Sequence, residues 1–307
     1  LLEFLNPDRI EVSDRFTLLK VGRWAKQHKV ASLVFSHETL NGLVKKYAPF
    51  IPTSVRDKFV NWHNARLATT FDNVIATTNF AAAEFVRIKT SNLRKVALGV
   101  DLVGFNPENR NSKLRKELLK GSEFLLVHCG RMSPEKQPER SVQALAELVK
   151  AGVNARLVIV GGGPLWNKIR KQSTGLPVDM VGYIASRQKV ADYLAAADLA
   201  IAPGPLETFC LSALESLASG TPVVASKSSA VGEILNINSI KAAGAVASDD
   251  GISFANEIIK LLNKGNLRKV ARNQAEQFSW ANTIDAMLDI HDAKKPMVTT
   301  KRRLKAA

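Results

Sequence analysis

The segment Glu207-Thr-Phe-Cys-Leu-Ser-Ala-Leu-Glu215 follows the apolar run Leu199–Pro203, whose pattern predicts a buried strand. A helix is predicted to begin near Phe209 and to extend to about Ser219. The start of a helix exposes backbone N–H groups and carries a partial positive charge, so it can hold a phosphate. Glu207 precedes this helix, and Glu215 lies roughly two turns further along at about 1.5 Å per residue. Two carboxylates around a phosphate seat suit a nucleotide sugar, whose diphosphate joins a sugar to a ribose.

Strand and helix patterns alternate along most of the chain. Short apolar runs at Ala31–Phe35 and Asn73–Ala76, and again at Phe124–Cys129 and Arg156–Val160, are separated by helical patterns. Such runs, bounded by polar turns, are typical of parallel sheets covered by helices on both faces. Gly99–Lys113 interrupts the alternation with a proline and several asparagines, and is predicted to be a linker. We therefore predict two doubly wound domains that face each other across a cleft, where such sheets bind ligands.

The composition is that of a globular protein, with 46% hydrophobic and 23% charged residues. No apolar run reaches the roughly 18–20 residues that a membrane-spanning helix needs. Cys129 and Cys210 are far apart and lack metal-ligand spacing, which favours a reducing cytoplasm. The net charge of +15 suits nucleic acid, an anionic membrane surface or an anionic substrate, although solvated helix faces would also explain it.

A second group of candidate residues follows the strand at Phe124–Cys129. Arg131 and Lys136 flank a helix that Ser133 is predicted to cap, with Pro134 at its first position. Two cations beside a helix start can neutralise a diphosphate and stabilise it as it leaves. Taken alone, they could equally be surface cations of an ordinary loop.

Three further patterns are weaker. Gly161-Gly-Gly-Pro164 lets a backbone approach a ligand but lacks the full dinucleotide glycine spacing, and Gly182-Tyr-Ile184 could offer backbone groups to a base. His37, beside Glu38, ends a strand at the predicted cleft edge, although a lone histidine is more often structural. Asp249-Asp250 precedes a helix and is predicted to cap it rather than to bind a metal.

Together these motifs resemble the retaining glycosyltransferases of family 4, which have the GT-B fold. Four segments carry the resemblance: Gly130-Arg-Met-Ser-Pro-Glu-Lys136, Val160-Gly-Gly-Gly-Pro164, Glu207–Glu215 and Ala218-Ser-Gly-Thr-Pro-Val-Val-Ala225. Within that family, two segments look most like actinobacterial α-mannosyltransferases that build phosphatidylinositol mannosides: Asp8-Arg-Ile-Glu-Val-Ser-Asp14 and Ser36-His-Glu-Thr-Leu40.

The resemblance implies a role for each candidate residue. Arg131 and Lys136 would hold the donor diphosphate, Glu207 the donor sugar hydroxyls and Glu215 the ribose. His37 would lie near the outer hydroxyls of the sugar. The N–H groups of three residues would complete the phosphate seat: Phe209, Cys210 and Leu211. The remaining predicted donor-site residues are Gly130, Gly162 and Ile184.

The resemblance also implies a chemistry and a place. The donor would be GDP-mannose, and no cofactor, metal or protein nucleophile would be needed. The acceptor would be an anionic lipid or a glycan, reached in the cytoplasm or by peripheral contact at the inner membrane face. Two alternatives remain at this stage: a non-catalytic nucleic-acid-binding protein, motivated by the charge, and a sugar-nucleotide epimerase of the same fold.

The domain bounds follow from the linker and the resemblance. We predict a first, acceptor-side domain over residues 1–107, incomplete because the opening strand of the family has no counterpart, and a nucleotide-sugar-binding domain over 108–280. A helix over 281–293 would cross back to the first domain, and 294–307 would be a basic tail.

Overall fold

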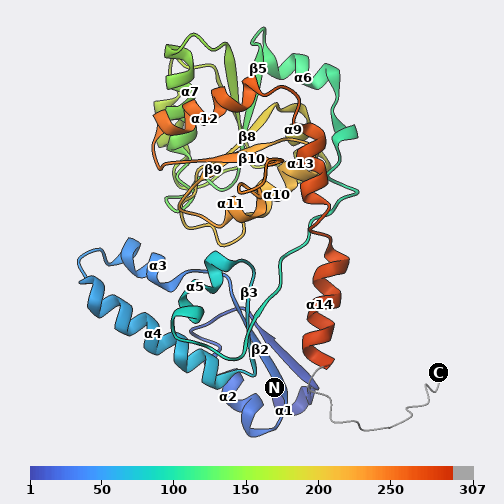
Figure 1. The fold of residues 1–307 in the computed structure, drawn as a ribbon. Helices are drawn as coiled ribbons and strands as arrows, with labels where there is room; N and C mark the ends of the chain where they lie inside the picture. Colours follow the sequence, from blue (N-terminus) through green and yellow to red (C-terminus); the bar gives the residue numbers. More distant parts are fainter. Residues whose placement is uncertain (293–307) are drawn as a thin grey trace, which may run out of the picture.

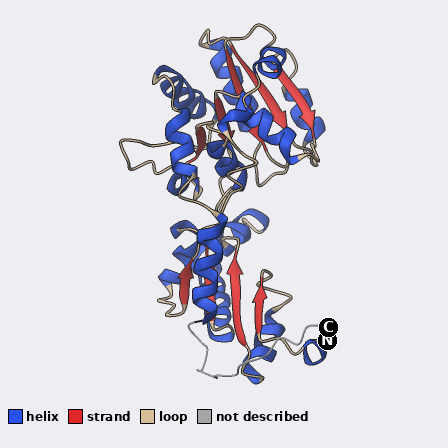
Figure 2. Cartoon of the chain, turned by 90° about the vertical axis from the view of Figure 1, so that its right-hand side faces the viewer, coloured by secondary structure: helices blue, strands red, loops and turns tan. Residues whose placement is uncertain are grey.

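The computed structural model describes residues 1–292, which form two α/β lobes joined by two crossing segments (Figure 1). Each lobe has one parallel sheet with helices on both faces, and the two sheets lie one above the other in Figure 2. The predicted basic tail, 294–307, lies outside the described residues. The predicted domain bounds stay predictions, because a strand or helix boundary does not by itself fix where a folding unit ends.

The N-terminal lobe has four parallel strands in the order β1-β2-β3-β4. They span Arg9–Val12, Ala31–Ser36, Asn73–Ala76 and Leu93–Lys95. The connections contain α2 (Leu19–Gln27), α3 (Leu40–Tyr47), α4 (Thr53–Thr70) and α5 (Asn79–Arg87), and a short α1 (Leu2–Leu5) precedes β1. Parallel neighbours need such crossover helices, and these bury the apolar strands on both faces.

The C-terminal lobe has six parallel strands in the order β10-β9-β8-β5-β6-β7. They span Gly244–Ala247, Val223–Ser226, Leu199–Ala202, Phe124–Cys129, Ala155–Val160 and Val178–Gly182 in that order. The direction of winding reverses between β5 and β8. The carboxyl ends of these two strands are therefore the switch point, where doubly wound sheets bind their ligands.

The helices of this lobe cover both faces of the sheet. They are α6 (Ser112–Leu119), α7 (Glu139–Lys150), α8 (Trp166–Gln172), α9 (Arg187–Ala196), α10 (Leu211–Ala218), α11 (Val231–Ile234), α12 (Gly251–Asn263) and α13 (Arg268–Ala275). One apolar cluster, with Leu145, Leu157 and Phe254, lies on the face covered by α7 and α12. The other, with Leu194, Leu214 and Leu217, lies under α9 and α10.

The last described helix, α14 (Trp280–Asp292), returns to the N-terminal lobe (Figure 1). Its residues Ala286, Met287 and Ile290 pack on the sheet of that lobe. The two crossing segments also touch, because Val100 N–H donates to Phe278 O at 2.9 Å. The lobes are thus joined by two chain segments that contact each other, rather than by one linker.

Two predicted helices begin later than expected. The predicted helix start at Ser133 is wrong, because α7 begins at Glu139. Gln137 has a φ of 45°, which is not helical. Met132 N–H donates to Gly162 O at 2.8 Å, which holds the start of the loop against the glycine turn. Ser133 instead bonds Glu135. The helix predicted from Phe209 begins at Leu211.

The predicted linker is also shorter than expected. Within Gly99–Lys113, a 3₁₀ turn at Pro107–Asn109 and the start of α6 are already part of the C-terminal lobe. Asn111 caps α6 by accepting from the N–H groups of Lys113 and Leu114. The cap residue was visible in the sequence, but the short, polar helix after it has no strong apolar period. By contrast, the predicted cap at Asp250 is confirmed, since it accepts from Ser253 N–H.

Candidate active site

The candidate site lies at the switch point, between the loops that follow β5 and β8 and the edge of the N-terminal lobe. A cavity of about 340 Å³ occupies this place. Its lining contains eight of the predicted residues: His37, Gly130, Arg131, Lys136, Glu207, Phe209, Cys210 and Leu211. Residues far apart in sequence are therefore brought to one hollow, with the N-terminal lobe supplying His37 and the C-terminal lobe the rest.

Lys136 and Glu207 form an ion pair in the lining of the cavity. Lys136 Nζ lies 2.5 Å from Glu207 Oε1, and only 13% of the Glu207 side chain is exposed. The Glu207 carbonyl accepts from Ala230 N–H at 2.8 Å, which fixes the backbone of this loop. A partly buried ammonium beside a carboxylate places a phosphate-binding charge next to a group that can accept hydrogen bonds from hydroxyls.

The start of α10 provides the free N–H groups that the sequence predicts. Cys210, the residue before the helix, has φ 72° and ψ 79°, a left-handed conformation that is uncommon for a residue with a side chain. Within the described part of the chain, the N–H groups of Phe209, Cys210 and Leu211 have no hydrogen-bond acceptor. Such a group of N–H donors at a helix start is suited to an anion.

Arg131 stands at the rim of the same cavity. Its side chain is 69% exposed, and its Nε lies 3.9 Å from Glu135 Oε1. Glu135 is shared with Lys46 of α3, whose Nζ lies 3.4 Å from Glu135 Oε2. Because an exposed pair at this distance is weak, Arg131 can turn toward an anion in the cavity with little loss.

A second cavity of about 600 Å³ adjoins the first and shares Gly130 and Arg131 with it. Gly162, Tyr183 and Ile184 also line it, so two more predicted residues lie at the site. The glycine turn is needed here, because a Cβ on Gly161 would lie 1.9 Å from Gly130 O. A mostly apolar hollow beside a phosphate seat has the form expected for a base and its sugar.

Glu215 is placed differently from the other predicted residues. It lies outside the lining of both cavities, and its Oε1 is 3.4 Å from Arg187 Nη2. Burial raises the pKa of its carboxyl group, although Arg187 opposes this effect. Its predicted role toward a ribose stays a prediction, since Arg187 would have to release it.

His37 is held by its backbone and by its ring. Thr208 Oγ1 donates to His37 O at 2.5 Å, and the imidazole stacks on Phe35 with ring centroids 5.4 Å apart. Burial lowers the pKa of the imidazole, with Glu38 opposing. The ring is therefore neutral at pH 7 and can exchange hydrogen bonds with a hydroxyl.

Sequence reasoning missed a buried polar network under the His37 loop. Arg15, only 4% exposed, donates to Glu38 O at 2.9 Å and to the Asn64 side chain. Glu84 accepts from Asn41 N–H at 2.7 Å and from Asn64 Nδ2 at 3.0 Å. These residues are far apart in the sequence and follow no known spacing, so no local signal could have found them.

The two cysteines near the site are unreactive as the structure places them. Burial raises the pKa of Cys129 and of Cys210 to about 12, so both thiols are protonated at neutral pH. Among residues 1–292, no group of three or more histidine, cysteine or acidic side chains is placed to hold a metal ion. In the same range, every helix is too short or too polar to cross a bilayer.

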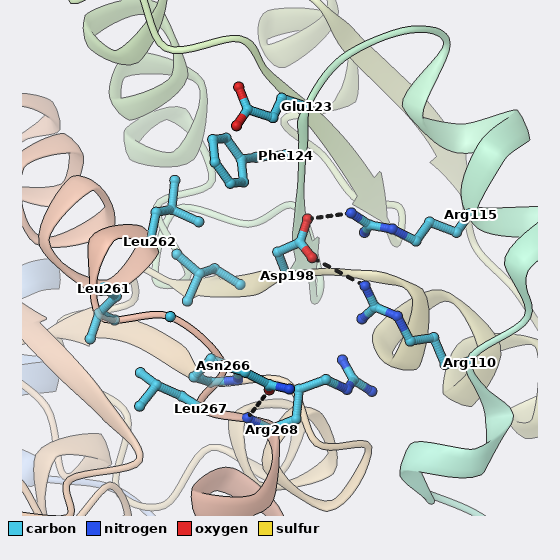
Figure 3. Close-up of a pocket in the computed structure, with 13 residues that line it drawn as sticks. Arg110, Arg115, Glu123, Phe124, Asp198, Leu261, Leu262, Asn266, Leu267 and Arg268 are labelled. Atoms are coloured by element: carbon cyan, nitrogen blue, oxygen red, sulfur yellow. Dashed lines mark hydrogen bonds and ion pairs between the residues drawn. The ribbon is translucent and has the colours of Figure 1, made fainter.

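A further cavity, of about 430 Å³, lies at the amino ends of β5 and β8, and Figure 3 shows the side chains that line it. Arg110 and Arg115 bond the Asp198 carboxylate there, with Nη2 atoms at 3.2 and 2.9 Å from its oxygens. Arg268 bonds the carbonyl oxygens of Ala197 and Ser219. These guanidinium groups bind carbonyl oxygens at the C-terminal ends of α9 and α10. The arginines that line this cavity therefore have a structural role.

Comparison with known proteins identifies the class to which this fold and cleft belong. A family described as "Glycosyl transferases group 1" matches residues 109–278, more than half of the chain. The chain belongs to this family, and it is a glycosyltransferase that binds a nucleotide-sugar donor. The membership supports the transferase prediction and gives no support to the nucleic-acid-binding and epimerase alternatives.

The relatives are more specific. A GDP-mannose-dependent alpha-(1-6)-phosphatidylinositol dimannoside mannosyltransferase of Mycobacterium tuberculosis (strain ATCC 25177 / H37Ra) is 45% identical over 289 residues, which cover 94% of this chain and 74% of that protein. A D-inositol 3-phosphate glycosyltransferase of Mycolicibacterium smegmatis is 30% identical over 232 residues, 71% of this chain and 52% of that protein.

Solved structures confirm the predicted fold. Anabaena Alr3699/HepE in complex with UDP matches with a TM-score of 0.77 at 18% identity, over 94% of this chain and 79% of that chain. Sucrose-phosphate synthase from Thermosynechococcus elongatus matches with a TM-score of 0.75 at 22% identity, over 95% and 75%. At these identities the likeness concerns the two-lobed architecture alone.

Proposed function

We propose that this chain transfers a mannosyl group from GDP-mannose to a phosphatidylinositol-mannoside-type lipid, with retention of anomeric configuration. The observation that carries the proposal is the Lys136–Glu207 pair beside the free N–H groups of α10. The relative that is 45% identical supports the donor and the acceptor, because it is described as a GDP-mannose-dependent phosphatidylinositol dimannoside mannosyltransferase.

The donor would occupy the two adjoining cavities. Its guanosine would enter the cavity lined by Gly162 and Ile184, and its mannose the one lined by His37 and Glu207. The diphosphate would then lie where the two meet, beside Arg131, which lines both. In this position Glu207 exchanges its bond with Lys136 for sugar hydroxyls, while Lys136 turns to the phosphate.

The chain's contribution to the chemistry is electrostatic. In the step we propose, an acceptor hydroxyl attacks the anomeric carbon on the face that the diphosphate leaves. The bond from that carbon to the phosphate oxygen breaks, the new glycosidic bond forms, and the acceptor proton passes to the departing GDP. Lys136, Arg131 and the N–H groups of α10 stabilise the charge that grows on the diphosphate. We propose that these groups suffice without a metal ion, so activity should survive a chelator.

Acceptor binding would take place at a membrane surface. The helix α4 presents Val55, Phe59 and Trp62 on one exposed stripe, with the Arg66 guanidinium 5.5 Å from the Trp62 ring centroid. An exposed aromatic stripe with cations beside it favours the interface of an anionic bilayer. We propose peripheral contact with the inner membrane face, from the cytoplasm, through this stripe.

The direct test is transfer of labelled mannose from GDP-mannose to phosphatidylinositol dimannoside. We expect Glu207→Gln to lower kcat/KM by about 10²–10³, the range measured when a transition-state contact is removed. Glu257→Gln is the matched control, because Glu257 lies on α12 and pairs with Lys260 at 2.7 Å. Equal turnover by Glu207→Gln and wild type would remove Glu207 from the site. A product of inverted configuration would refute the front-face step.

The donor base can be tested separately. GDP should raise the Tm of the chain more than UDP, because at equal concentration the ligand with the lower Kd stabilises the folded state more. A larger shift with UDP would contradict the proposed donor while leaving the transferase class intact.

A further inference from the structure

An apolar groove of about 540 Å³ lies between α3 and α4 of the N-terminal lobe. Leu40, Leu43 and Val44 of α3 form one wall, Phe59 of α4 forms the other, and Ile51 of the connecting loop closes one end. Arg56 adds a charge to the lining, and its guanidinium bonds Thr53 Oγ1 at 3.3 Å. A concave surface made of hydrocarbon side chains is suited to a hydrocarbon ligand.

The same helix connects this groove to the donor site. On its other side, α3 meets the C-terminal lobe: a Cβ on Gly42 would lie 2.8 Å from Leu206 Cδ2, and Lys46 pairs with Glu135. Leu206 directly precedes Glu207 in the chain. Because α3 has eight residues, at about 1.5 Å each it is only about 12 Å long. The groove and the loops that carry Glu135 and Glu207 therefore lie on two sides of one short helix.

The mouth of the groove combines apolar and basic side chains. Tyr47, which lines the groove, is 71% exposed, which is unusual for such a large ring. Arg56 lines the groove, and Lys46 Nζ lies 5.2 Å from the ring centroid of Tyr47, which also lines it. Apolar surface with ammonium groups around it complements an amphiphile that has a hydrocarbon chain and an anionic phosphodiester head.

We propose that the groove holds one acyl chain of the lipid acceptor and so aligns its headgroup with the donor cavity. This inference rests on the proposed transfer to a lipid-linked acceptor. The exposed stripe of α4 shares Val55 and Phe59 with the groove and can meet the bilayer as a whole, whereas the groove is concave and bounded by α3, which also contacts the C-terminal lobe. An acyl chain of the acceptor is therefore the occupant that both features favour, and bulk lipid is the outcome that the test must separate.

The test compares Val44→Trp, which fills the groove, with Val86→Trp on the exposed surface of α5. Both are assayed with phosphatidylinositol dimannoside in detergent and with its deacylated, water-soluble form. We expect Val44→Trp to raise the KM for the acylated acceptor at least about tenfold and to leave the KM for the deacylated form within about twofold, since only the former has a chain to place in the groove. Val86→Trp should behave as wild type with both.

Three results would overturn the inference. The first is an unchanged KM of Val44→Trp for the acylated acceptor, and the second is an equal rise for both acceptors. The third is a parallel loss of binding to phosphatidylglycerol vesicles that contain no acceptor, which would assign the groove to bulk membrane.

A binding measurement separates this inference from the proposed function. Phosphatidylinositol that carries a diazirine in one acyl chain should label wild-type peptides within residues 40–59, and this labelling should disappear in Val44→Trp. Labelling confined to other peptides would refute the groove even if mannose transfer is observed. Labelling at residues 40–59 without mannose transfer to either acceptor would keep the lipid groove and refute the proposed reaction.

Discussion

Acidification from pH 8 to pH 5 should weaken the C-terminal lobe through one imidazole, that of His128. The side chain is 2% exposed at the carboxyl end of β5, and its Nδ1 lies 2.9 Å from Ser141 Oγ on α7. Burial, with the like charge of Lys136 as a smaller cause, lowers its pKa from 6.5 to about 4. The unfolded chain takes up a proton near pH 6.5, whereas the folded chain resists until about pH 4. The stability gained from the neutral imidazole is therefore present above pH 6.5 and is lost as the pH falls toward 4.

The magnitude follows from that difference in pKa. At about 1.4 kcal/mol for each tenfold change in proton affinity, the full loss is about 3 kcal/mol, of which about 2 kcal/mol is lost by pH 5. Urea unfolding at pH 8 and pH 5 measures it, with His128→Asn as the comparison, because asparagine keeps a polar atom near the position of Nδ1. Wild type should lose about 2 kcal/mol more than the variant over this range. Equal losses would show that His128 is not held neutral by the fold, and the reasoning about its burial would be wrong.

Two other perturbations probe the neighbourhood of the site. Arg15→Met removes the bond to Glu38 O and should lower kcat by roughly ten- to a hundredfold, because His37 is then misplaced. The affinity for GDP should not change. A variant that loses both turnover and GDP binding would indicate general unfolding. Glu215→Gln should raise Tm at pH 8. Burial raises the pKa of the Glu215 carboxyl in the folded chain, so the stability that this group contributes is present below pH 4.5 and is lost as the pH rises through its folded pKa. Glutamine is uncharged and avoids this loss. The advantage of the variant should narrow toward pH 4.5, and a lower Tm at pH 8 would show that the Arg187 pair outweighs the cost of burial.

The sheets could be predicted because their strands are encoded locally. Apolar runs such as Leu125–Val127 and Leu157–Val160 are too short for helices and lie in segments bounded by polar turns. This pattern indicates strands that are buried on both faces of a sheet. Short connections and right-handed crossovers then restrict how such strands can be joined. The carboxyl ends of β5 and β8 are consequently brought together, and the residues that follow them share one cleft.

The sequence predicts where the loops that carry the site lie in the chain, but it does not predict their backbone conformation. Ser133-Pro134 has the local signature of a helix start, yet the chain remains irregular as far as Pro138. The reason is tertiary: Met132 is fully buried, and its carbonyl accepts from Leu165 N–H at 2.9 Å. This contact holds the loop against the glycine turn and leaves Lys136 directed at Glu207. The local helix propensity of this loop is outweighed by its contact with Leu165, some thirty residues away, as is common where the helix signal is weak.

The position of the free N–H groups was predicted more closely than the conformation of the chain that carries them. Sequence reasoning placed free N–H groups at Phe209–Leu211, and the described part of the structure leaves them unbonded at that point. It could not foresee that Cys210 takes a left-handed conformation, because nothing in a cysteine favours φ 72°. Strain of this kind persists only where the surroundings impose it, and it is most frequent at functional sites.

Contact between the lobes is made at the residue that precedes these N–H groups. The Thr208 carbonyl accepts from Thr77 Oγ1 and Thr78 Oγ1 at 3.2 and 2.8 Å, and its own hydroxyl donates to His37 O. A change in the angle between the lobes must therefore move Thr208, and with it the N–H groups of Phe209 and Cys210. A diphosphate held by those groups favours one lobe arrangement over others, and that arrangement must in turn favour the diphosphate by the same free energy. If a diphosphate binds as we propose, its binding and the approach of the two lobes are therefore coupled through Thr208.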